Sequence, residues 1–429
     1  MNNEMLLGVR DKPKKWYEWI IYPLQMLLAI FVATVLIANI CGTPISTALI
    51  GAAIGTLIYE VITKFKSPMF ISSCGATASA VLGALTTTSG KYISVAVGGA
   101  IIFLVYLAFA LLIKFGGKKY FDKVFPPIVV GAVTIVIGLN LAGFIPGYMG
   151  ISADGVINYV PVLVALFTMG VTAVITHYCK GFFKTVGFLG GLICGFILAI
   201  IIETAGGYNF NIIYNLTHWE WFNPKDFAFM NWDTSFTLAD FGRTVSLFLP
   251  VSICAALEHY SDHKVLGNII GVDLTVDPGL DRTLIGDGLA SAVGAIIGGQ
   301  PNTSYGESIA TIGFSRVASV WMTTIAAAVL GVMGFIAPIT AFINAIPSAV
   351  FGGCAMILYG YIAASGLKTL INNKVDLENN KNLIVVSVIL TVGVSGIYLF
   401  DASFAGVSLA MVLGVILNLG LVERKKKLD

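Results

Sequence analysis

Apolar runs of about 20 residues recur along the whole chain, and no other feature limits its fold as strongly. A helix needs a run of that length to cross the hydrocarbon core of a bilayer. The 429 residues are 57% hydrophobic and 11% charged, whereas soluble globular proteins are about 25% charged. We therefore expect an all-α, polytopic protein in a lipid bilayer. The net charge of +2 forms no basic patch on a folded domain, so no nucleic-acid partner is expected.

Hydropathy and helix-breaking residues predict fourteen membrane segments. They lie near 20–40, 45–63, 68–90, 92–113, 126–146, 158–178, 184–204, 244–264, 284–300, 302–315, 317–337, 346–366, 383–399 and 403–421. Two halves of seven segments, 20–204 and 244–421, are joined by residues 205–243, which are rich in Trp, Phe, Asn and Asp. We expect this connection to lie along the outer face of the membrane, as a hairpin or helix at the interface with water.

The positive charges test the segment count independently. With fourteen segments and a cytoplasmic N-terminus, all but three of the 25 Lys and Arg residues lie on the inner side, and the exceptions are Lys91, Lys225 and Arg243. An odd count would place the terminal "ERKKK" outside. We therefore expect a multi-pass protein of the cytoplasmic (inner) membrane, with residues 1–19 and the basic residues 422–429 as cytoplasmic tails.

Two segments in corresponding positions are interrupted by Pro, Gly, Ser and Thr. The third contains "KSPMFISSCGATASAVLGA" and the tenth "GGQPNTSYGESIATIGFSR". Irregular backbone at membrane depth is tolerated only where protein or a polar cavity satisfies it. Interrupted segments in matching positions of two halves point to a transporter binding site in an inverted repeat, and halves of seven segments have opposite orientations. The alternative is a pair of kinked helices packed on small residues.

Ionisable residues inside these segments need a physical reason, because a carboxylate at mid-membrane costs roughly 2.5–3.5 kcal/mol. Glu307 follows Gly306 in the tenth segment. Its carboxylate can accept hydrogen bonds from N–H groups of a neutral ligand, while neighbouring backbone amides can donate to carbonyl oxygens. This donor–acceptor face suits a flat heterocycle. The alternative is a structural cap where the helix restarts.

Glu258 and Asp262 lie four residues apart in the eighth segment, and therefore on one helix face. Two adjacent carboxylates in a low dielectric resist ionising together, so one is expected to hold a proton. This arrangement suits proton coupling. His259 and His263 are candidates for a relay, although their spacing places them on other faces and each alone can be structural or interfacial.

Other polar features carry less functional information. Asp287 is expected at the start of the ninth segment, where a helix-entry role is as good an interpretation as a functional one. Glu60 and Glu203 lie near segment ends and are expected to be solvated. The six cysteines show no C-x-x-C spacing, so no metal site is expected. The chain lacks Walker A, HExxH and GxSxG motifs, and we expect neither an ATP-driven pump nor an enzyme.

"PNTSYGE" at 301–307, the Glu258 segment and the "DPGL" loop together resemble the nucleobase–cation symporters, also called nucleobase–ascorbate transporters, and most closely the bacterial uracil permeases. The resemblance covers essentially the whole chain. It implies two inverted repeats of seven segments, a core domain (segments 1–4 and 8–11) and a gate domain (5–7 and 12–14). It also implies short paired strands in segments 3 and 10, and a homodimer formed through the gate.

The resemblance also implies the site residues. Glu307, with the amides of Tyr305 and Gly306, would hold the base. Glu258 would bind it and take part in proton coupling, with no other cofactor, and Tyr359 in "AMILYG" would steady the site. The family signature of an acidic or amide residue, Asn, any residue, Gly, four residues, Thr and Arg, Lys or Gly is only partly kept. Here it reads "ESIA", four residues, then "SR", so the first and last positions match.

Departures from the family pattern leave the cargo open. In the third segment, Ser73 and Gly75 stand in "SSCGAT", where the family usually offers a stacking aromatic at the position of Gly75. Asp262 stands where some members carry a coupling histidine, and His263 comes one residue later. The expected function is proton-coupled import of uracil or a related pyrimidine. A purine such as xanthine or urate is the alternative, because Gly75 and Ala355 leave room for a second ring. A passive channel or an anion exchanger is a third interpretation. The carboxylate of Glu307 disfavours an exchanger of inorganic anions, and a channel would pass solute without saturation or pH dependence.

Overall fold

The computed structural model describes residues 5–73, 75, 77–89, 91–116, 126–151, 155–180, 187–218, 221, 227–230, 235–395, 397 and 406–421. In the first half the elements are α1 (Glu18–Cys41), α2 (Ile45–Ile62), β1 (Ile71–Ser73), α3 (Ala78–Thr87), α4 (Tyr92–Gly116), α6 (Pro127–Ala142), α7 (Ile145–Tyr148), α8 (Tyr159–Tyr178), α10 (Gly187–Thr204) and α11 (Ile212–Thr217). A 3₁₀ turn, η2 (Ala228–Met230), lies in the connection. In the second half they are α12 (Leu238–Ile270), the π-turn η3 (Thr275–Gly279), α13 (Leu280–Ile297), β2 (Asn302–Ser304), α14 (Gly306–Ser315), α15 (Val320–Phe335), α16 (Ala337–Asn344), α17 (Ser348–Asn372), α18 (Asn380–Val394) and α19 (Gly406–Gly420).

The chain is a helical, multi-pass membrane protein. Eight helical stretches among the described residues are long and apolar enough to cross a bilayer: α1, α2, α4, α6 with α7, α8, α10, α12 and α17. The α15–α16 pair makes a ninth if its two helices, bent by 81°, form one span. Helices α3, α18 and α19 are apolar but shorter. The fourteen-segment count therefore stays a prediction. The predicted inner-side residues Lys118, Lys119, Lys123, Lys184 and 422–429, and the outer-side Lys225, lie outside the described residues.

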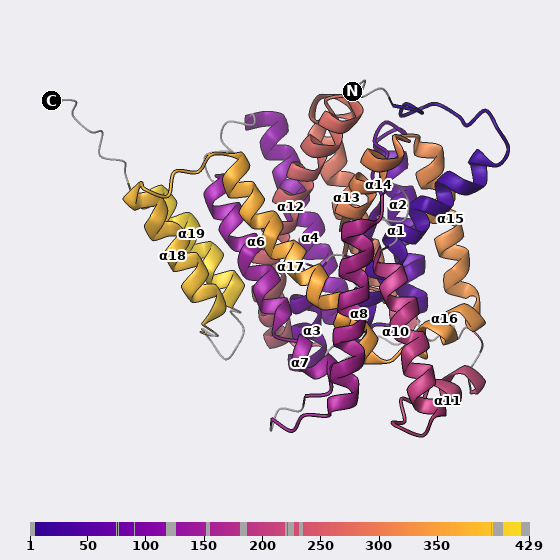
Figure 1. Cartoon of the computed structure of the whole chain (residues 1–429). Coiled ribbons are helices and arrows are strands. Elements are labelled where there is room, and N and C mark those ends of the chain that lie inside the picture. The colour runs from indigo at the N-terminus through magenta and orange to yellow at the C-terminus, as the bar shows by residue number, and fades with distance from the viewer. Residues whose placement is uncertain are drawn as a thin grey trace.

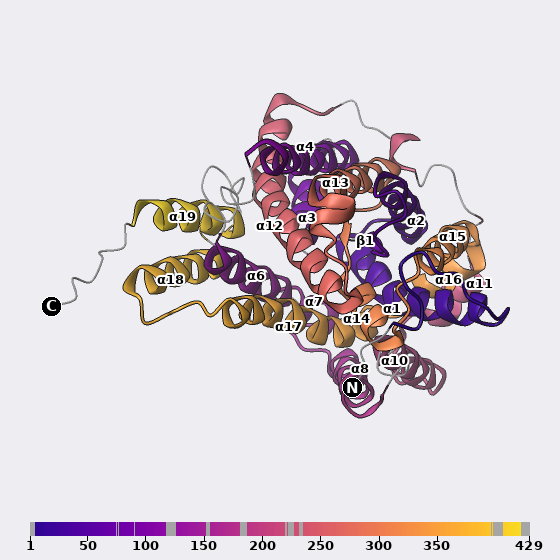
Figure 2. The same ribbon diagram turned by 90° about the horizontal axis from the view of Figure 1, so that it is seen from above.

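The helices pack as two groups, which Figure 2 shows side by side. In one group α13 packs on α4 and α2, α15 packs on α2, and α12 packs on α4. In the other, α17 packs on α6 and α8, while α18 lies between α19 and α6. Helix α12 also contacts α19 and α6, so it lies at the boundary between the groups. In Figure 1, α18 and α19 form one edge of the molecule and α15 and α16 the other.

The two interrupted segments contain the predicted strands. β1 pairs antiparallel with β2, and Ile71, Ser72 and Ser73 lie opposite Ser304, Thr303 and Asn302. Each strand leads into a short helix, α3 or α14. The alternative of two kinked helices is therefore wrong. Because the strands pair with each other, their backbone groups find partners deep in the molecule.

Side chains satisfy the remaining backbone groups around this strand pair. Asn302 donates from Nδ2 to the carbonyl oxygens of Gly51 (3.0 Å) and Ala290 (3.2 Å). Ser291 donates to the carbonyl of Asn302. The Thr56 hydroxyl donates to the carbonyl of Ile71 at 2.8 Å and accepts from its N–H at 3.1 Å. Breaker residues in the sequence thus correspond to backbone held by α2 and α13.

The predicted N-terminal tail is partly ordered against the second half of the chain. The N–H groups of Leu6 and Leu7 donate to the carbonyl of Arg316, at 2.8 and 3.3 Å, and the N–H of Ala318 donates to the carbonyl of Leu7 at 2.9 Å. Leu7 is buried with Val317 and Met322 in a small apolar cluster. This N-terminal segment therefore covers the connection from α14 to α15.

Two expectations about carboxylates need correction, those for Glu60 and Asp287. Glu60 is fully buried rather than solvated, and it accepts a hydrogen bond from Thr324 of α15 at 2.6 Å. Glu203 is partly exposed, which agrees with its expected place near a segment end, and it accepts from the N–H groups of residues 210, 212 and 213, so it caps the start of α11. Asp287 lies inside α13 and is fully buried, so it does not mark a helix entry. The predicted segment 317–337 ends in a sharp bend before α16.

Candidate functional site

A cavity lies where the two helix groups meet. Its lining residues come from α1, the strand pair, α6, α12, α14 and α17, and they are Ile37, Ser73, Gly75, Thr134, Ile137, Glu258, Thr303, Ser304, Tyr305, Gly306, Glu307, Leu358 and Ile362. Polar groups come mostly from the strands, α12 and α14, whereas α6 and α17 contribute mainly apolar side chains. A small ligand with a polar edge and an apolar face would fit this division.

Glu258 and Glu307 are the charged residues of the lining. Glu258 lies in the second half of the 33-residue helix α12, and Glu307 lies in the first turn of α14. The first N–H groups of a helix have no acceptor within it, so the start of α14 offers donors next to the Glu307 acceptor. Both carboxylates are half-buried. The cavity thus presents acceptors from two helices and donors from one.

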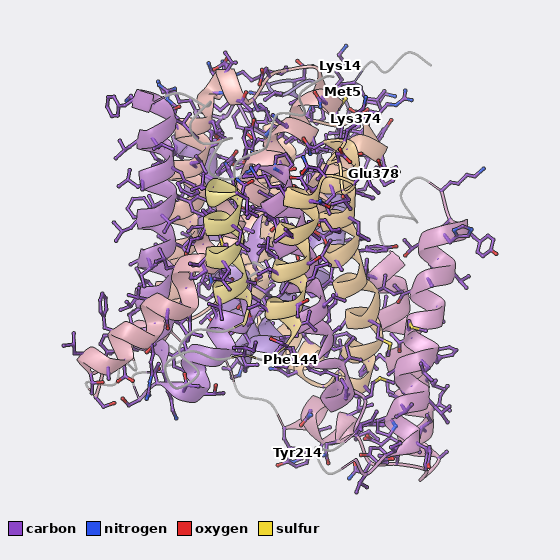
Figure 3. The ribbon with its side chains drawn as sticks, turned by 90° about the vertical axis from the view of Figure 1, so that its left-hand side faces the viewer. Met5, Lys14, Phe144, Tyr214, Lys374 and Glu378 are labelled. Atoms are coloured by element: carbon purple, nitrogen blue, oxygen red, sulfur yellow. The ribbon has the colours of Figure 1, made fainter. Side chains whose placement is uncertain are left out.

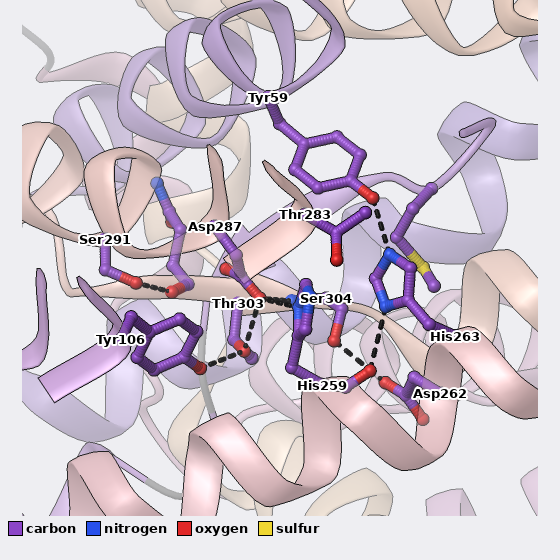
Figure 4. Close-up of polar contacts among 12 residues, drawn as sticks. Tyr59, Tyr106, His259, Asp262, His263, Thr283, Asp287, Ser291, Thr303 and Ser304 are labelled. Atoms are coloured by element: carbon purple, nitrogen blue, oxygen red, sulfur yellow. Dashed lines mark hydrogen bonds and ion pairs between the residues drawn. The ribbon is translucent and has the colours of Figure 1, made fainter. Parts of the chain in front are cut away.

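Two further carboxylates lie behind β2 and hold one of its residues. The Ser304 hydroxyl donates to Asp262 Oδ2 at 3.0 Å, and the Ser304 N–H donates to Asp287 Oδ2 at 3.0 Å. The Thr303 hydroxyl donates to the same oxygen of Asp287 at 3.2 Å. Figure 4 shows Thr303 and Ser304 between α12 and Asp287. Ser304 therefore connects the cavity to both carboxylates.

The two buried histidines of α12 make different contacts. His259 Nδ1 lies 2.5 Å from Asp287 Oδ2, and both side chains are fully buried. His263 donates from Nδ1 to the carbonyl of His259 at 2.8 Å, so its Nε2 can accept from the Tyr59 hydroxyl at 2.5 Å. The imidazole rings lie 4.0 Å apart between centroids. This network links α2, α12, α13 and β2 by hydrogen bonds (Figure 4).

The structure brings most of the predicted binding residues together. Six of them line the cavity: Ser73, Gly75, Glu258, Tyr305, Gly306 and Glu307. Asp262 lies behind the lining and reaches it through Ser304. His263 and Tyr359 are outside the lining, although Tyr359 follows the lining residue Leu358 on α17. Ala355 is also outside it and fully buried, so it does not enlarge the cavity.

Sequence reasoning missed the pairing of His259 with Asp287 and the position of Ser304. The two partners of the pair are 28 positions apart, so no helical spacing connects them. The available signal was Asp287 itself, an acidic residue among the small residues of "LIGDGLASAVGAIIGG". A carboxylate in such a segment needs a buried donor, and His259 supplies one.

Comparisons with known proteins agree with this arrangement. Residues 17–402 match the family model Xan_ur_permease, described as "Permease family". The uracil permease of Bacillus subtilis (strain 168) is 37% identical to the chain, over 98% of this chain and 96% of that protein. The uracil permease of Escherichia coli (strain K12) is 33% identical, over 96% and 93%. The transmembrane domain of a cyanobacterial bicarbonate transporter, BicA, has the same fold, with a TM-score of 0.65 at 14% identity, covering 96% of this chain and 99% of that one. The chain therefore belongs to this permease family, whose members are membrane transporters and not enzymes.

Proposed function

We propose that this protein is a secondary active transporter that imports uracil, or a related pyrimidine nucleobase, by proton symport with alternating access. The observation that carries the proposal is the cavity between the two helix groups, which is lined by Glu258, by Glu307 and by the start of α14. Relatives named uracil permeases, which match nearly the whole chain, support uracil as the cargo.

The cavity supports a specific binding mode. Uracil carries two ring N–H donors and two carbonyl acceptors on a flat ring. The Glu307 carboxylate would accept from an N–H group, and the amides of Tyr305 and Gly306 would donate to a carbonyl oxygen. Glu258 would bind from the opposite helix, while Ser73 and Gly75 would border the ligand on the β1 side. Tyr359 would steady this arrangement from α17.

Proton coupling would use the carboxylates on α12. Glu258 lies in the cavity and Asp262 is one helical turn further on, joined to the cavity through Ser304. A proton taken up by this pair from outside would be released inside after the two helix groups have moved. His263, hydrogen-bonded to Tyr59, is the proposed coupling histidine. The proton serves as the coupling ion.

We also propose the domain layout that the sequence predicts. Fourteen segments would form inverted repeats at 20–204 and 244–421. The helix group that contains α12 and α13 would be part of the core, and the group that contains α6 and α17 would be part of the gate. The antiparallel pairing of β1 with β2 supports two-fold symmetry. In Figure 1 the N-terminal segment and the end of α19 lie toward the upper side of the molecule, and α11 lies at the lower side. In Figure 3 Lys14 and Lys374 lie in the upper part and Tyr214 in the lower part. This arrangement supports tails 1–19 and 422–429 on one side, proposed to be cytoplasmic, and an outer connection at 205–243. An inner-membrane location is part of the same proposal. A homodimer through the gate completes the proposal.

Uptake and binding of labelled uracil by purified protein in proteoliposomes tests the proposed site. Glu307→Gln keeps the shape but replaces the charged carboxylate by a neutral amide, so we expect binding to weaken about tenfold or more, because hydrogen bonds to charged groups contribute about 1.5–3 kcal/mol. Glu378→Gln is the matched control, because Glu378 is exposed at the molecular edge (Figure 3). Saturable wild-type uptake that survives Glu307→Gln unchanged would remove Glu307 from the site.

A further inference from the structure

The lining of the cavity has an apolar part made by both helix groups. Ile37 comes from α1, and Ile137, Leu358 and Ile362 come from α6 and α17. Helix α1 packs with α2, α14 and α15, whereas α17 packs with α6 and α8. A ligand in the cavity therefore meets apolar side chains that belong to two separately packed groups.

Gly75 lies where these side chains converge. A Cβ atom on residue 75 would lie 3.3 Å from Cδ1 of Ile362 and 3.7 Å from Cδ1 of Ile37. The first distance is tighter than an ordinary carbon–carbon contact of about 3.5–4.0 Å. The absence of a side chain at 75 thus leaves only a narrow space, because the ends of Ile37 and Ile362 border the cavity next to the glycine. The sequence-based expectation that Gly75 makes room for a second ring does not fit this geometry.

We propose that Ile362, together with Ile37, is the specificity-determining contact of the cavity. The two side chains pack on the flat face of a one-ring ligand in place of a side chain at residue 75. Ile362 limits ligand size, because a second fused ring would need the volume that its side chain fills. This inference rests on the proposed function, since it concerns the cavity in which the nucleobase is proposed to bind. Ile362 would also take part in the transport cycle. It lies on α17, in one helix group, and would contact a ligand that is bound by residues of the other group.

Three variants test the proposal in proteoliposomes, with labelled uracil supplied in the external solution. Ile362→Ala removes apolar contact with the ligand, so uracil affinity should fall about tenfold. Unlabelled xanthine, a two-ring base, should then inhibit uracil uptake about tenfold better than in the wild type. Gly75→Phe should abolish uptake, because its ring collides with Ile362. The double variant Gly75→Phe/Ile362→Ala should recover uptake, because the new ring takes the space that Ile362 leaves.

Controls separate this inference from the proposed function. Ile371→Ala changes the same residue type on the same helix at a position that is 72% exposed, and it should leave both affinities unchanged. Gel filtration of each variant reports folding. If Gly75→Phe does not fold, xanthine competition against Ile362→Ala protein is a sufficient test by itself. Two results would overturn the specificity role alone, provided that the wild type takes up uracil. In the first, the double variant takes up uracil no better than Gly75→Phe; in the second, Ile362→Ala has wild-type affinity for both bases. A folded wild type that takes up no nucleobase overturns the proposed function and this inference with it.

Discussion

At the scale of single residues, the interior of this protein depends on polar side chains that satisfy one another inside a membrane. Asp287 accepts hydrogen bonds from three groups through one oxygen: His259, the Thr303 hydroxyl and the Ser304 N–H. Water cannot replace a lost partner in an apolar interior, so each of these bonds has a larger effect than it would at a surface. The strand β2, which borders the cavity, is held by this one carboxylate and by Asp262.

Replacing His259 tests the role of the buried pair in stability. His259→Ala removes the 2.5 Å contact with Asp287 and leaves a buried carboxylate short of a donor. Such a loss costs about 1–3 kcal/mol, and more for a charged group. We expect a lower thermal unfolding midpoint in detergent than for His218→Ala, which changes an exposed histidine near α11. Equal midpoints for the two variants would show that the pair contributes nothing to folding.

At the scale of elements, glycines allow α6 and α17 to approach closely. A Cβ atom on Gly138 would lie 2.5 Å from the backbone nitrogen of Ala363 and 2.8 Å from the carbonyl oxygen of Tyr359. Small residues permit such backbone contact between membrane helices. The α6–α17 contact carries four apolar or hydroxyl residues into the cavity lining: Thr134, Ile137, Leu358 and Ile362.

Enlarging Gly138 should therefore separate the two helices. Gly138→Leu inserts a side chain where the backbone of α17 lies, at a cost of about 1–3 kcal/mol or more for overpacking. We expect little monodisperse protein on gel filtration after expression. Gly170→Leu is the control, because nothing lies within 4 Å of a Cβ at that position of α8. If both variants give the same monodisperse yield as the wild type, the α6–α17 packing described above is incorrect.

The N-terminal segment offers a second element-scale prediction. Leu7 is 9% exposed in its cluster with Val317 and Met322, whereas its neighbour Leu6 is 64% exposed. Leu7→Asp places a carboxylate in this apolar cluster and should release the segment. Hydrogen exchange at the amides of Ala318 and Val320, which donate to residues 7 and 9, should then accelerate strongly. Leu6→Asp should leave that exchange unchanged, and equal exchange in both variants would rule out this docking.

The elements differ in how much of them the sequence could predict. The interrupted segments were predictable, because Pro68 and Pro301 each lie in a cluster of Gly, Ser and Thr, and such clusters favour non-helical backbone. The burial of Glu60 was not predictable, because its hydrogen-bond donor is Thr324, which lies 264 positions away in the sequence. The same reason hid the contact of His259 with Asp287, which depends on how α12 packs near α13. Helical spacing describes one helix at a time, so it detected the Glu258–Asp262 face and missed contacts between helices. The side chains of Ile37 and Ile362, which lie next to Gly75, come from α1 and α17, so helical spacing could not predict this contact either.

At the scale of the whole molecule, the cavity lies where two groups of helices meet, and this position suits alternating access. Rocking of one group against the other would expose the cavity to either side while the strand pair keeps Glu307 and Ser304 in place. The fold resembles that of a bicarbonate transporter, yet this cavity is lined by two carboxylates, which repel an inorganic anion and suit a neutral ligand with N–H donors. Nucleobase transport, with the proposed proton uptake at the carboxylates, fits this cavity.

The most direct test of this claim is the accumulation of labelled uracil in proteoliposomes under an imposed inward proton gradient. We predict that internal uracil rises above the external concentration, that a protonophore abolishes the rise, and that Glu258→Gln protein does not produce it. Uptake that only equilibrates, at the same rate with and without the proton gradient, would contradict proton symport and indicate a passive or differently coupled pathway.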